Sequence, residues 1–336
     1  MHYLCWLADL FGVEMLEKYH VPIAIVAGFI LDFFLGDPYR MPHPVRFIGA
    51  LISFLEKRLL NTEDSKLRQR AFGFVLVALV LLATGGISAG FLYLFYRIHF
   101  VAGFILELLL CYFCIAANDL KKESMNVLKK LQGSSIEDSR KALARIVGRD
   151  TQSLDEEEIV KAAVETVAEN SNDGVIAPLF YMALGGPVLG MIYKAVNTMD
   201  SMVGYKNERY RFFGTAAARC DDIFGFIPAR LSAFFAIATC PLLKLNARKA
   251  FKIFMRDRYK HSSPNSAQTE SVYAGAMEIQ LGGDAFYGGI LEHKEFLGDD
   301  IRKPCAKDIK SACGLMYASS LLTLLIFCAV RFALTK

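Results

Sequence analysis

The chain has 336 residues, of which 54% are hydrophobic and 21% are charged. Soluble domains are typically about 45–50% apolar and about 25% charged, so the composition favours an integral membrane protein over a soluble one. The formal net charge of +4 is too small to indicate a nucleic-acid-binding protein. The one CxxC, at Cys111 and Cys114, lies in an apolar helical pattern, which favours buried free thiols over a metal site.

Four apolar runs are predicted to cross a membrane as helices. About 20 consecutive apolar residues are enough to span a bilayer, and the run at 71–96 contains no charged side chain. The run at 99–117 is nearly as apolar. The other predicted spans are 21–36 and 312–334.

Two further apolar runs carry features that a simple span avoids. The run at 175–196 is interrupted by Gly-Gly-Pro at 185–187, and proline breaks the hydrogen-bond ladder of a helix. The run at 223–243 contains Pro228 and Arg230, and a charge at membrane depth is costly. We predict that both runs form re-entrant or protein-packed helices, because broken backbone at membrane depth is tolerated where protein buries it or a cavity lies beside it.

The basic residues predict the orientation of the chain. Cytoplasmic loops of membrane proteins carry an excess of Lys and Arg. The predicted cytoplasmic segments are 37–70, 118–173, 197–222 and 244–311. The sequence therefore predicts an all-α, polytopic integral membrane helical protein. It is expected to form a single membrane-embedded domain over 1–336, with re-entrant or broken helices and a helical cytoplasmic portion.

The cytoplasmic portion is predicted to be helical because no segment alternates with the period of a strand over a useful length. Ser153 with Glu156 fits a capping box, which opens a helix. Asn265 with Gln268 fits another helix start, and the glycines at 282–283 are predicted to close that helix.

A group of oxygen-bearing side chains precedes the first of the broken apolar runs. Glu165 and Glu169 are four residues apart and so share a helix face, and the sequence VAENSNDG adds Asn170, Asn172 and Asp173. A solvated helix face explains the two glutamates alone. The whole group also suits Mg²⁺, which proteins usually hold through carboxylates together with substrate phosphates.

Three more polar groups lie in the predicted cytoplasmic segments. A positive-inside anchor, a simple ion pair and the close packing of small residues each explain part of them. All of the groups are nevertheless predicted on one side of the membrane, which favours a shared site there. Their members are Asn197, Asp200, Lys206, Asn207 and Arg209, then Arg219, Asp222 and Arg230, and finally Asn265 and Glu270.

The chain carries a series of long motifs in a fixed order. They are LGDP with MPHPV, VGRDT, ETVAENSNDGVIAPLFY, NTMDSMVGYKNERY, AARCDD with IPARL, SPNSAQTES, LGGDAFYGG and LGDDIR. From about residue 25 to 310, the chain resembles the adenosylcobinamide-phosphate synthases, also called cobinamide synthases, which are membrane enzymes of cobalamin biosynthesis. Two positions depart from the family pattern: Gly225 stands where an Asn is expected, and Asn118-Asp119 stand where Arg-Ser is common.

The resemblance implies a reaction. An aminopropanol or its O-phosphate is joined by an amide bond to a propionate carboxylate of adenosylcobyric acid, which gives adenosylcobinamide or its phosphate. ATP with Mg²⁺ is implied to drive the coupling through an acyl phosphate. The resemblance also implies a multi-pass protein of the prokaryotic plasma membrane, with its site on the cytoplasmic side. The implied partners are the lipid bilayer and other membrane enzymes of late cobalamin assembly, without nucleic acid.

The polar groups suit this chemistry, because phosphoryl transfer needs Mg²⁺ and cations placed on developing negative charge. The predicted metal ligands are Glu165, Glu169, Asp173 and Asp200. The predicted catalytic residues are Asp222, Glu270 and His43, with Asp222 or Glu270 accepting the proton of the amine, although packing explains His43 equally well. The predicted substrate-binding residues are Asn170, Asn172, Asn197, Lys206, Asn207, Arg209, Arg219, Arg230 and Asn265, among which Lys206, Arg209 and Arg219 would clamp phosphates.

Two other classes of protein remain open at this point. A corrinoid or small-molecule transporter also has broken helices and polar groups near the midplane, and Asp32, Glu107 and Arg230 would line its path. A non-catalytic membrane scaffold for enzymes of the same pathway would tolerate alanine at Glu169 or Asp200.

Overall fold

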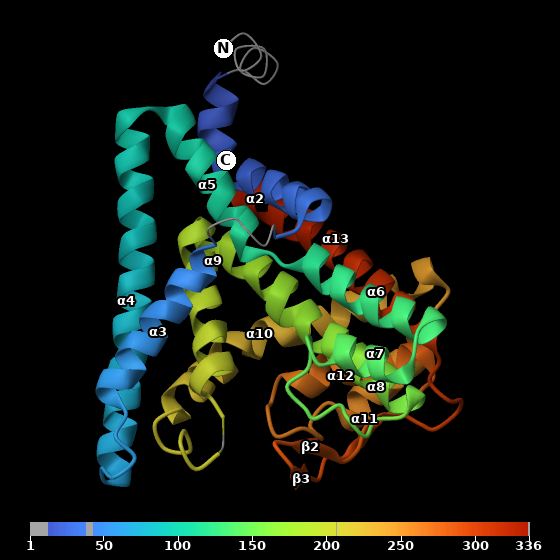
Figure 1. Ribbon diagram of the computed structural model, residues 1–336. Helices are drawn as coiled ribbons and strands as arrows, with labels where there is room; N and C mark the ends of the chain where they lie inside the picture. The colour runs from blue at the N-terminus through green and yellow to red at the C-terminus, as the bar shows by residue number, and fades with distance from the viewer. Residues whose placement is uncertain (1–12, 38–42, 206, 335–336) are drawn as a thin grey trace. The chain divides into compact units, whose positions relative to one another are not determined.

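The computed structural model describes residues 13–37, 43–205 and 207–334 (Figure 1). Within these ranges the chain is mostly helical, with only very short strands, which confirms the predicted all-α class. The chain divides into two compact units. Unit 1 comprises Met1–Ile115, Pro178–Asp221 and Leu324–Lys336, and unit 2 comprises Ala116–Ala177 and Asp222–Thr323.

Six helices in the described part of the chain are long and apolar enough to cross a membrane, as expected of a multi-pass membrane protein. They are Met15–Leu35, Lys66–Ile98, Phe100–Gly133, Glu156–Val203, Thr215–Leu243 and Ala306–Ala333. Two of them contain the runs predicted to be re-entrant or packed. Both qualify as spans by length and composition, so their re-entrant course stays a prediction.

Unit 1 contains helices from both ends of the chain. They are α2 (Val13–Leu35), α3 (Pro44–Leu59), α4 (Lys66–Ile98), α5 (Phe100–Cys114), most of α9 (Ala177–Val203), the start of α10 (Thr215–Thr239) and the end of α13 (Ala306–Leu334). In Figure 1 the long α4 runs beside α3 and turns into α5, which packs against α2. His99 forms that turn: it ends α4, and its Nδ1 accepts a hydrogen bond from Val101 N at 3.2 Å to start α5.

The predicted break in the run at 175–196 is present in α9. Gly185 and Gly186 leave the helical region, and Gly186 has a φ of +66°, which favours glycine. A proline follows directly. The second half of the helix continues to Val203, beyond the predicted end of the run.

α10, in contrast, continues as one helix through Pro228. Arg230 lies one turn after Phe226, donates to its carbonyl oxygen at 2.7 Å and places its guanidinium 3.5 Å from the centre of the Phe226 ring. The charge that the sequence places in this apolar run is therefore matched by protein groups, which lowers the cost of keeping it there.

Unit 2 is built around one helix, α12 (Ser266–Met277), in which every residue is buried. Most of its side chains are small, and both α11 (Ala247–Asp257) and α8 (Glu156–Ser171) pack against it. A Cβ at Gly275 would meet the carbonyl oxygen of Lys249 at 2.7 Å, so glycine permits the close approach of α11. The remaining elements are α6 (Ala117–Gly133), α7 (Ile136–Leu143), the π-helix η1 (Asn172–Ile176), the 3₁₀-helix η2 (Cys240–Leu243) and the strands β1 (Leu281–Gly282), β2 (Ala285–Tyr287), β3 (Ile290–Glu292) and β4 (Phe296–Leu297).

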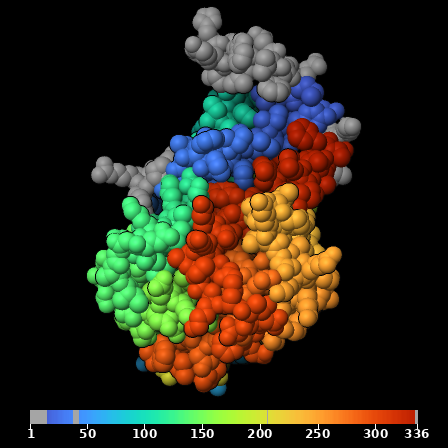
Figure 2. All heavy atoms as spheres, turned by 90° about the vertical axis from the view of Figure 1, so that its right-hand side faces the viewer, coloured from blue at the N-terminus to red at the C-terminus, as the bar shows by residue number. Residues whose placement is uncertain are grey.

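The strands of unit 2 form two small antiparallel pairs, β1 with β4 and β2 with β3. Figure 2 shows the face of unit 2 where the segment that leads from these strands into α13, orange to red, lies between the green α6 and α7 and the gold residues near 250. The strands are too short for the alternating pattern that reveals a strand in a sequence, which is why the sequence did not predict them.

The predicted capping box at the start of α8 is wrong by two residues. Asp155 Oδ1 accepts a hydrogen bond from Glu158 N at 2.9 Å, and Glu158 Oε2 accepts one from Asp155 N at 2.8 Å. Ser153 and Glu156 have the same spacing, but the box forms with Asp155, which directly precedes the first helical residue.

The predicted end of α12 is also wrong. The helix starts after Asn265 as expected, but it ends at Met277, where Glu278 takes the left-handed conformation with a φ of +59°. The glycines at 282–283 have φ values of +74° and +89°. Gly282 ends strand β1, and Gly283 lies directly after it.

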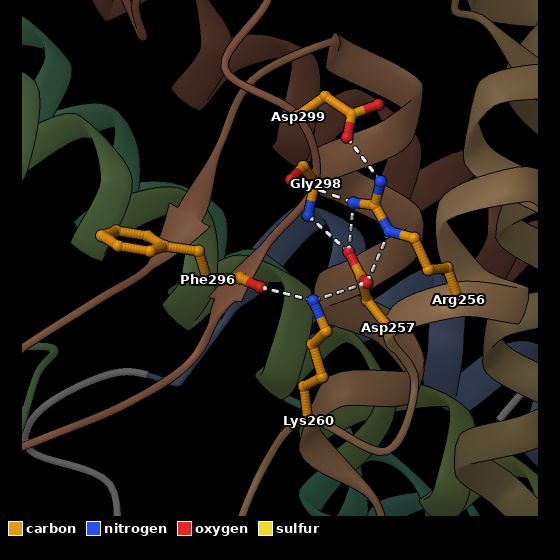
Figure 3. Close-up of polar contacts among 6 residues, drawn as sticks. All are labelled: Arg256, Asp257, Lys260, Phe296, Gly298 and Asp299. Carbon is orange, nitrogen blue, oxygen red and sulfur yellow. Dashed lines mark hydrogen bonds and ion pairs between the residues drawn. The ribbon is translucent and has the colours of Figure 1, made fainter.

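A cluster of ionic groups around Asp257 closes the end of α11 (Figure 3). The Asp257 side chain is fully buried and accepts hydrogen bonds from Arg256 Nε at 2.7 Å and Gly298 N at 2.8 Å. Lys260 Nζ lies 3.0 Å from the same carboxylate, and Arg256 also binds Asp299 at 2.6 Å. Burial raises the pKa of Asp257, but these donors together outweigh it and hold the pKa at about 2.

We expect the Asp257→Asn variant to be less stable than the parent at neutral pH by about 1.5–3 kcal/mol, the range for hydrogen bonds to charged groups. Because the folded pKa of about 2 lies below the ordinary value of 3.8, the carboxylate stabilises the fold above about pH 4, and this contribution disappears as the pH falls towards 2. Thermal unfolding of both proteins in detergent should show a difference that shrinks as the solution is acidified. A difference that is independent of pH would contradict the assignment.

The segment between α9 and α10 is predicted to face the cytoplasm, and Glu208 lies in a turn there. A Glu208→Cys variant, in a chain whose native cysteines are replaced, should react with a membrane-impermeant maleimide only after the cells are permeabilised. An Arg97→Cys control lies between the apolar runs at 71–96 and 99–117, outside the predicted cytoplasmic segments, and should react in intact cells. Efficient labelling at position 208 in intact cells would rule out the predicted re-entrant course of the neighbouring runs.

Candidate active site

Two glutamates on α8 lie one helical turn apart in unit 2, as predicted. Glu165 is 6% exposed, and both of its oxygens have donors. Oε1 accepts a hydrogen bond from Gly282 N at 2.7 Å, and Oε2 forms an ion pair with Arg149. Glu165 therefore joins α8 to strand β1 and to the loop that precedes α8.

Glu169, in the next turn, is accompanied by a third glutamate, which comes from the buried helix α12. Glu169 Oε1 accepts a hydrogen bond from Ser266 Oγ at 3.0 Å. Glu270 is 8% exposed, and within the described ranges no hydrogen bond reaches its carboxyl group. Burial, followed by the charges of Glu169 and Glu165, raises the pKa of Glu270 well above its ordinary value. The structure thus brings together three carboxyl groups whose simultaneous ionisation is unfavourable.

Two cations and a histidine lie within electrostatic reach of these glutamates. Lys294 and Arg149 lower the pKa of Glu270, although by less than burial and the neighbouring glutamates raise it. Burial lowers the pKa of His261, and Glu169 only partly opposes this effect. The imidazole of His261 is therefore neutral at pH 7 and able to accept a proton.

The hairpin formed by β2 and β3 is held beside these residues by one aspartate. Asp150 accepts hydrogen bonds from Gly288 N at 3.2 Å and from Gly289 N at 2.7 Å. These glycines have φ values of +58° and +80°, which the tight turn requires. Lys294 Nζ donates to the hydroxyl oxygen of Tyr287 on the same hairpin at 2.6 Å. The adjacent Arg and Asp of the VGRDT motif therefore organise two sides of one site.

The amides at the end of α8 bond to groups close by. Asn170 Nδ2 donates to Thr166 O at 3.0 Å. Asn172 is 2% exposed, donates to Asp173 Oδ1 at 2.7 Å and accepts from Ser232 Oγ at 3.0 Å. Asn172 and Asp173 begin the π-helix η1, a local widening that is frequent at functional sites. The predicted metal ligand Asp173 therefore already accepts a hydrogen bond from its neighbour.

A second polar group in unit 2 contains three more of the predicted residues. Asn265 Nδ2 donates to the carbonyl oxygen of Asp222 at 2.9 Å, and Arg230 donates to Asn265 Oδ1 at 3.2 Å. The Asp222 carboxylate accepts from Ser263 Oγ at 3.1 Å. A Cβ at Gly225 would lie 2.6 Å from Asn265 Nδ2, so the departure from the family pattern at this position leaves room for the Asn265 amide.

Some of the predicted substrate and metal residues lie in unit 1, near the end of α9. Asn197 and Asp200 are three residues apart and half-buried in that helix. Asn207 caps the following turn by accepting a hydrogen bond from Tyr210 N at 3.0 Å. Lys206 lies outside the described residues. The role of these residues in binding stays a prediction.

Three other predicted residues lie elsewhere in unit 1. Arg209 forms an ion pair with Glu56 at 2.8 Å. Arg219 is exposed on α10. His43 caps α3, because its Nδ1 accepts a hydrogen bond from Val45 N at 3.2 Å, which supports the packing explanation of this histidine.

The donor set suits a metal bound together with a nucleotide better than a metal bound by protein alone. In the described part of the chain, no group of three or more His, Cys, Asp or Glu side chains is arranged to hold a metal ion. Mg²⁺ often needs only one or two carboxylates plus phosphates. Glu169 and Glu270 fit that mode better than Glu165, whose two oxygens already have donors. A cation there would also relieve the repulsion that raises the pKa of Glu270.

Sequence analysis missed four residues of this site: Arg149, Asp150, His261 and Lys294. The first two lie in VGRDT, a motif that was noted without a role for its side chains. His261 stands just before SPNSAQTES, whereas Lys294 lies in a charged stretch with no signal of its own. A short charged motif outside a predicted helix is the signal that would have led to Arg149 and Asp150.

Fold and site together define a class, that of a multi-pass helical membrane protein with a buried acidic site in one of its two units. The model of the family described as CobD/Cbib protein matches residues 25–316, and the chain belongs to this family. This match confirms the resemblance carried by the motifs.

Curated relatives cover nearly the whole chain. The chain is 44% identical over 309 residues to the Cobalamin biosynthesis protein CobD of Clostridium perfringens, which covers 92% of this chain and 98% of that protein. It is 46% identical over 300 residues to the CobD of Pelobacter propionicus, over 89% of this chain and 92% of the relative. It is 43% identical over 309 residues to the Cobalamin biosynthesis protein CbiB of Salmonella arizonae, over 92% of this chain and 97% of that protein. No solved structure shows a significant match.

Proposed function

We propose that this protein acts in cobalamin biosynthesis as an ATP-dependent ligase. It joins (R)-1-aminopropan-2-ol, or its O-phosphate, to adenosylcobyric acid through an amide bond. The names of the relatives support the pathway, and the resemblance of the motifs supplies the reaction. The observation that carries the proposal is the group of Glu165, Glu169 and Glu270 with its cations in unit 2, in which Glu165 and Glu270 are buried.

The charges of this group suit a carboxylate that is activated by phosphate before an amine attacks it. Arg149 balances Glu165, which fixes the geometry of α8 without adding net charge. Lys294 uses one of its N–H donors on Tyr287 and retains others for a phosphate oxygen. When bound, Mg²⁺ held by Glu169 and Glu270 would supply positive charge for the phosphates of the nucleotide.

His261 is the acceptor that we propose for the proton released when the amine forms the amide. Its imidazole is neutral at pH 7 because burial lowers its pKa, and the charge of Glu169 acts on it, which supports its assignment to the acidic site. Asp222, one of the two acceptors considered from the sequence beside Glu270, instead binds Ser263 in the second polar group.

The test is an assay of the purified protein with ATP, Mg²⁺, adenosylcobyric acid and each form of the amine. We expect a product with the mass of adenosylcobinamide or its phosphate, and one ADP released for each amide formed. Transport of the corrinoid into liposomes without any amide product would favour the transporter class instead.

A pair of variants on the same helix links the activity to the site. Glu169→Gln removes the half-buried carboxylate that lies beside Glu270 and should abolish the coupling, whereas Glu156→Gln removes an exposed one in the first turn of α8 and should leave it intact. Equal activity of both variants would remove Glu169 from the proposed machinery.

A further inference from the structure

A cavity in unit 2 lies where two of the apolar helices end. It has a volume of about 570 Å³, and Lys244 to Arg248 are among the residues that line it. This stretch directly follows Leu243, the last residue of one candidate span. Arg302, Asp308 and Ser311 also line it, around the start of α13, where another candidate span begins at Ala306. The cavity therefore lies beside the ends of two helices that are long and apolar enough to cross a membrane.

The cavity carries unbalanced positive charge. Its acidic residues are already paired, since Asp308 binds Arg302 at 2.6 Å and Glu278 binds Lys249 at 3.0 Å. Lys244 and Arg248 are exposed, and neither side chain has a hydrogen bond or ion pair with any other described residue. Two cations are thus available to a ligand, and such a ligand has to be an anion.

The surroundings of the cavity are apolar and exposed. Leu242 is 77% exposed at the end of the span, and on α11 Phe251 and Met255 are each 49% exposed. Phe251 and Met255 share one face of α11 with Arg248 and Lys252, because neighbouring members of this set are one, three or four residues apart. The opposite face, with Ile253 and Phe254, is buried against the core of unit 2. A helix with cations and large apolar side chains on its exposed face is typical of one that lies in a membrane interface.

We propose that this cavity and the exposed face of α11 bind an anionic phospholipid of the surrounding membrane. Lys244 and Arg248 hold the phosphate of the headgroup, and the acyl chains lie along Leu242, Leu243 and Phe251. The continuity of the surface with two candidate spans identifies the ligand as a lipid of that membrane rather than a soluble phosphate. This site is separate in sequence from the acidic group and does not depend on the proposed reaction.

Native mass spectrometry of the full-length protein in mild detergent tests the proposal. We expect the parent to retain phosphatidylglycerol in preference to phosphatidylcholine. The Lys244→Gln/Arg248→Gln variant should bind phosphatidylglycerol about twenty-five-fold more weakly, because each basic residue near an anionic headgroup contributes roughly a factor of five. The matched control Lys129→Gln/Lys141→Gln removes two exposed cations elsewhere in unit 2 and should bind as the parent does.

Three results would overturn the proposal. They are unchanged lipid binding by Lys244→Gln/Arg248→Gln, an equal loss in the control, and displacement of the lipid by inorganic phosphate or glycerol phosphate at the same concentration. The last result would show that the cavity takes a soluble anion.

A second measurement covers the case in which the double variant does not fold. Phe251→Trp, in a chain whose natural tryptophan Trp6 is replaced by Phe, reports on the exposed face of α11. In proteoliposomes its fluorescence should be quenched by phosphatidylglycerol brominated on its acyl chains. Emission that is insensitive to these lipids would place α11 away from the membrane and contradict the proposal.

Discussion

The Glu270→Gln variant is expected to be more stable than the parent protein and inactive as a ligase. Burial and two neighbouring glutamates raise the pKa of Glu270. The ionised carboxylate therefore costs the folded state free energy, and an amide of the same shape removes that cost. We expect a gain of about 0.5–2 kcal/mol, as for other substitutions that relieve a functional site, and a loss of activity of about a hundred- to a thousandfold.

The pH dependence of this effect has a definite sign. Below the ordinary value of 4.5, Glu270 is protonated in both the folded and the unfolded chain and has no effect on stability. As the pH rises above that value, the unfolded chain ionises first, and the parent loses stability relative to Glu270→Gln. The gap between the unfolding midpoints of the two proteins should therefore widen from about pH 4 upward.

Mg²⁺ with a nucleotide should reverse the order of stability. If Glu270 is a metal ligand, the parent gains stability with Mg²⁺ and ATP, and the variant does not. Glu278→Gln is a control in which the change in stability should have the opposite sign. The hydrogen bond from Lys249 lowers the pKa of Glu278, so removing this carboxylate should destabilise the fold slightly. Equal stabilisation of the parent and Glu270→Gln by Mg²⁺ and ATP would exclude Glu270 from the metal site.

Removal of the Arg149 charge should have the largest effect on stability. Arg149→Met leaves Glu165 buried without its cation, which typically costs about 3–5 kcal/mol. The double variant Arg149→Met/Glu165→Gln should recover most of this loss, because the glutamine is neutral and still accepts the hydrogen bond from Gly282.

The matched control for this prediction is Arg145→Met. Arg145 also pairs with a glutamate, Glu123 at 2.8 Å, but its side chain is 52% exposed, so its loss should cost less than about 1 kcal/mol. Thermal unfolding of the four proteins in detergent gives the comparison. A small loss in Arg149→Met, or no recovery in the double variant, would show that Glu165 tolerates an unpaired charge.

Local chemistry made much of the fold predictable. Apolar runs of sufficient length gave the helices that qualify as spans, and the Gly-Gly-Pro at 185–187 gave the break in α9, because both depend on consecutive residues. The pairing of Glu165 and Glu169 followed from helical spacing for the same reason. The start of α8 was misplaced because two pairs of residues have the spacing of a capping box, and spacing alone does not choose between them.

The site as a whole depends on distant contacts. Glu165 is hydrogen-bonded to Gly282, which lies 117 positions away in the sequence, and Ser266 is hydrogen-bonded to Glu169, 97 positions away. Sequence analysis found Glu270 from its small neighbours, but its meeting with the α8 glutamates arises from the packing of α12 in the core. The ion pair of Arg149 was missed because a loop arginine has no periodicity that reveals its partner.

The order in which the chain is synthesised sets a limit on when it can fold. α13 contributes to both units, since unit 2 ends at Thr323 and unit 1 resumes at Leu324. In unit 1, Arg331 donates to the carbonyl oxygen of Ala183 at 2.9 Å, and Cys328 contacts Pro22 across 306 positions. A ribosome therefore releases α2 and α9 long before the helix that completes their contacts. The nascent chain has to be held in the membrane with unfilled helix contacts until α13 emerges, and a stop codon near the start of α13 would deprive both units of their part of this helix at once.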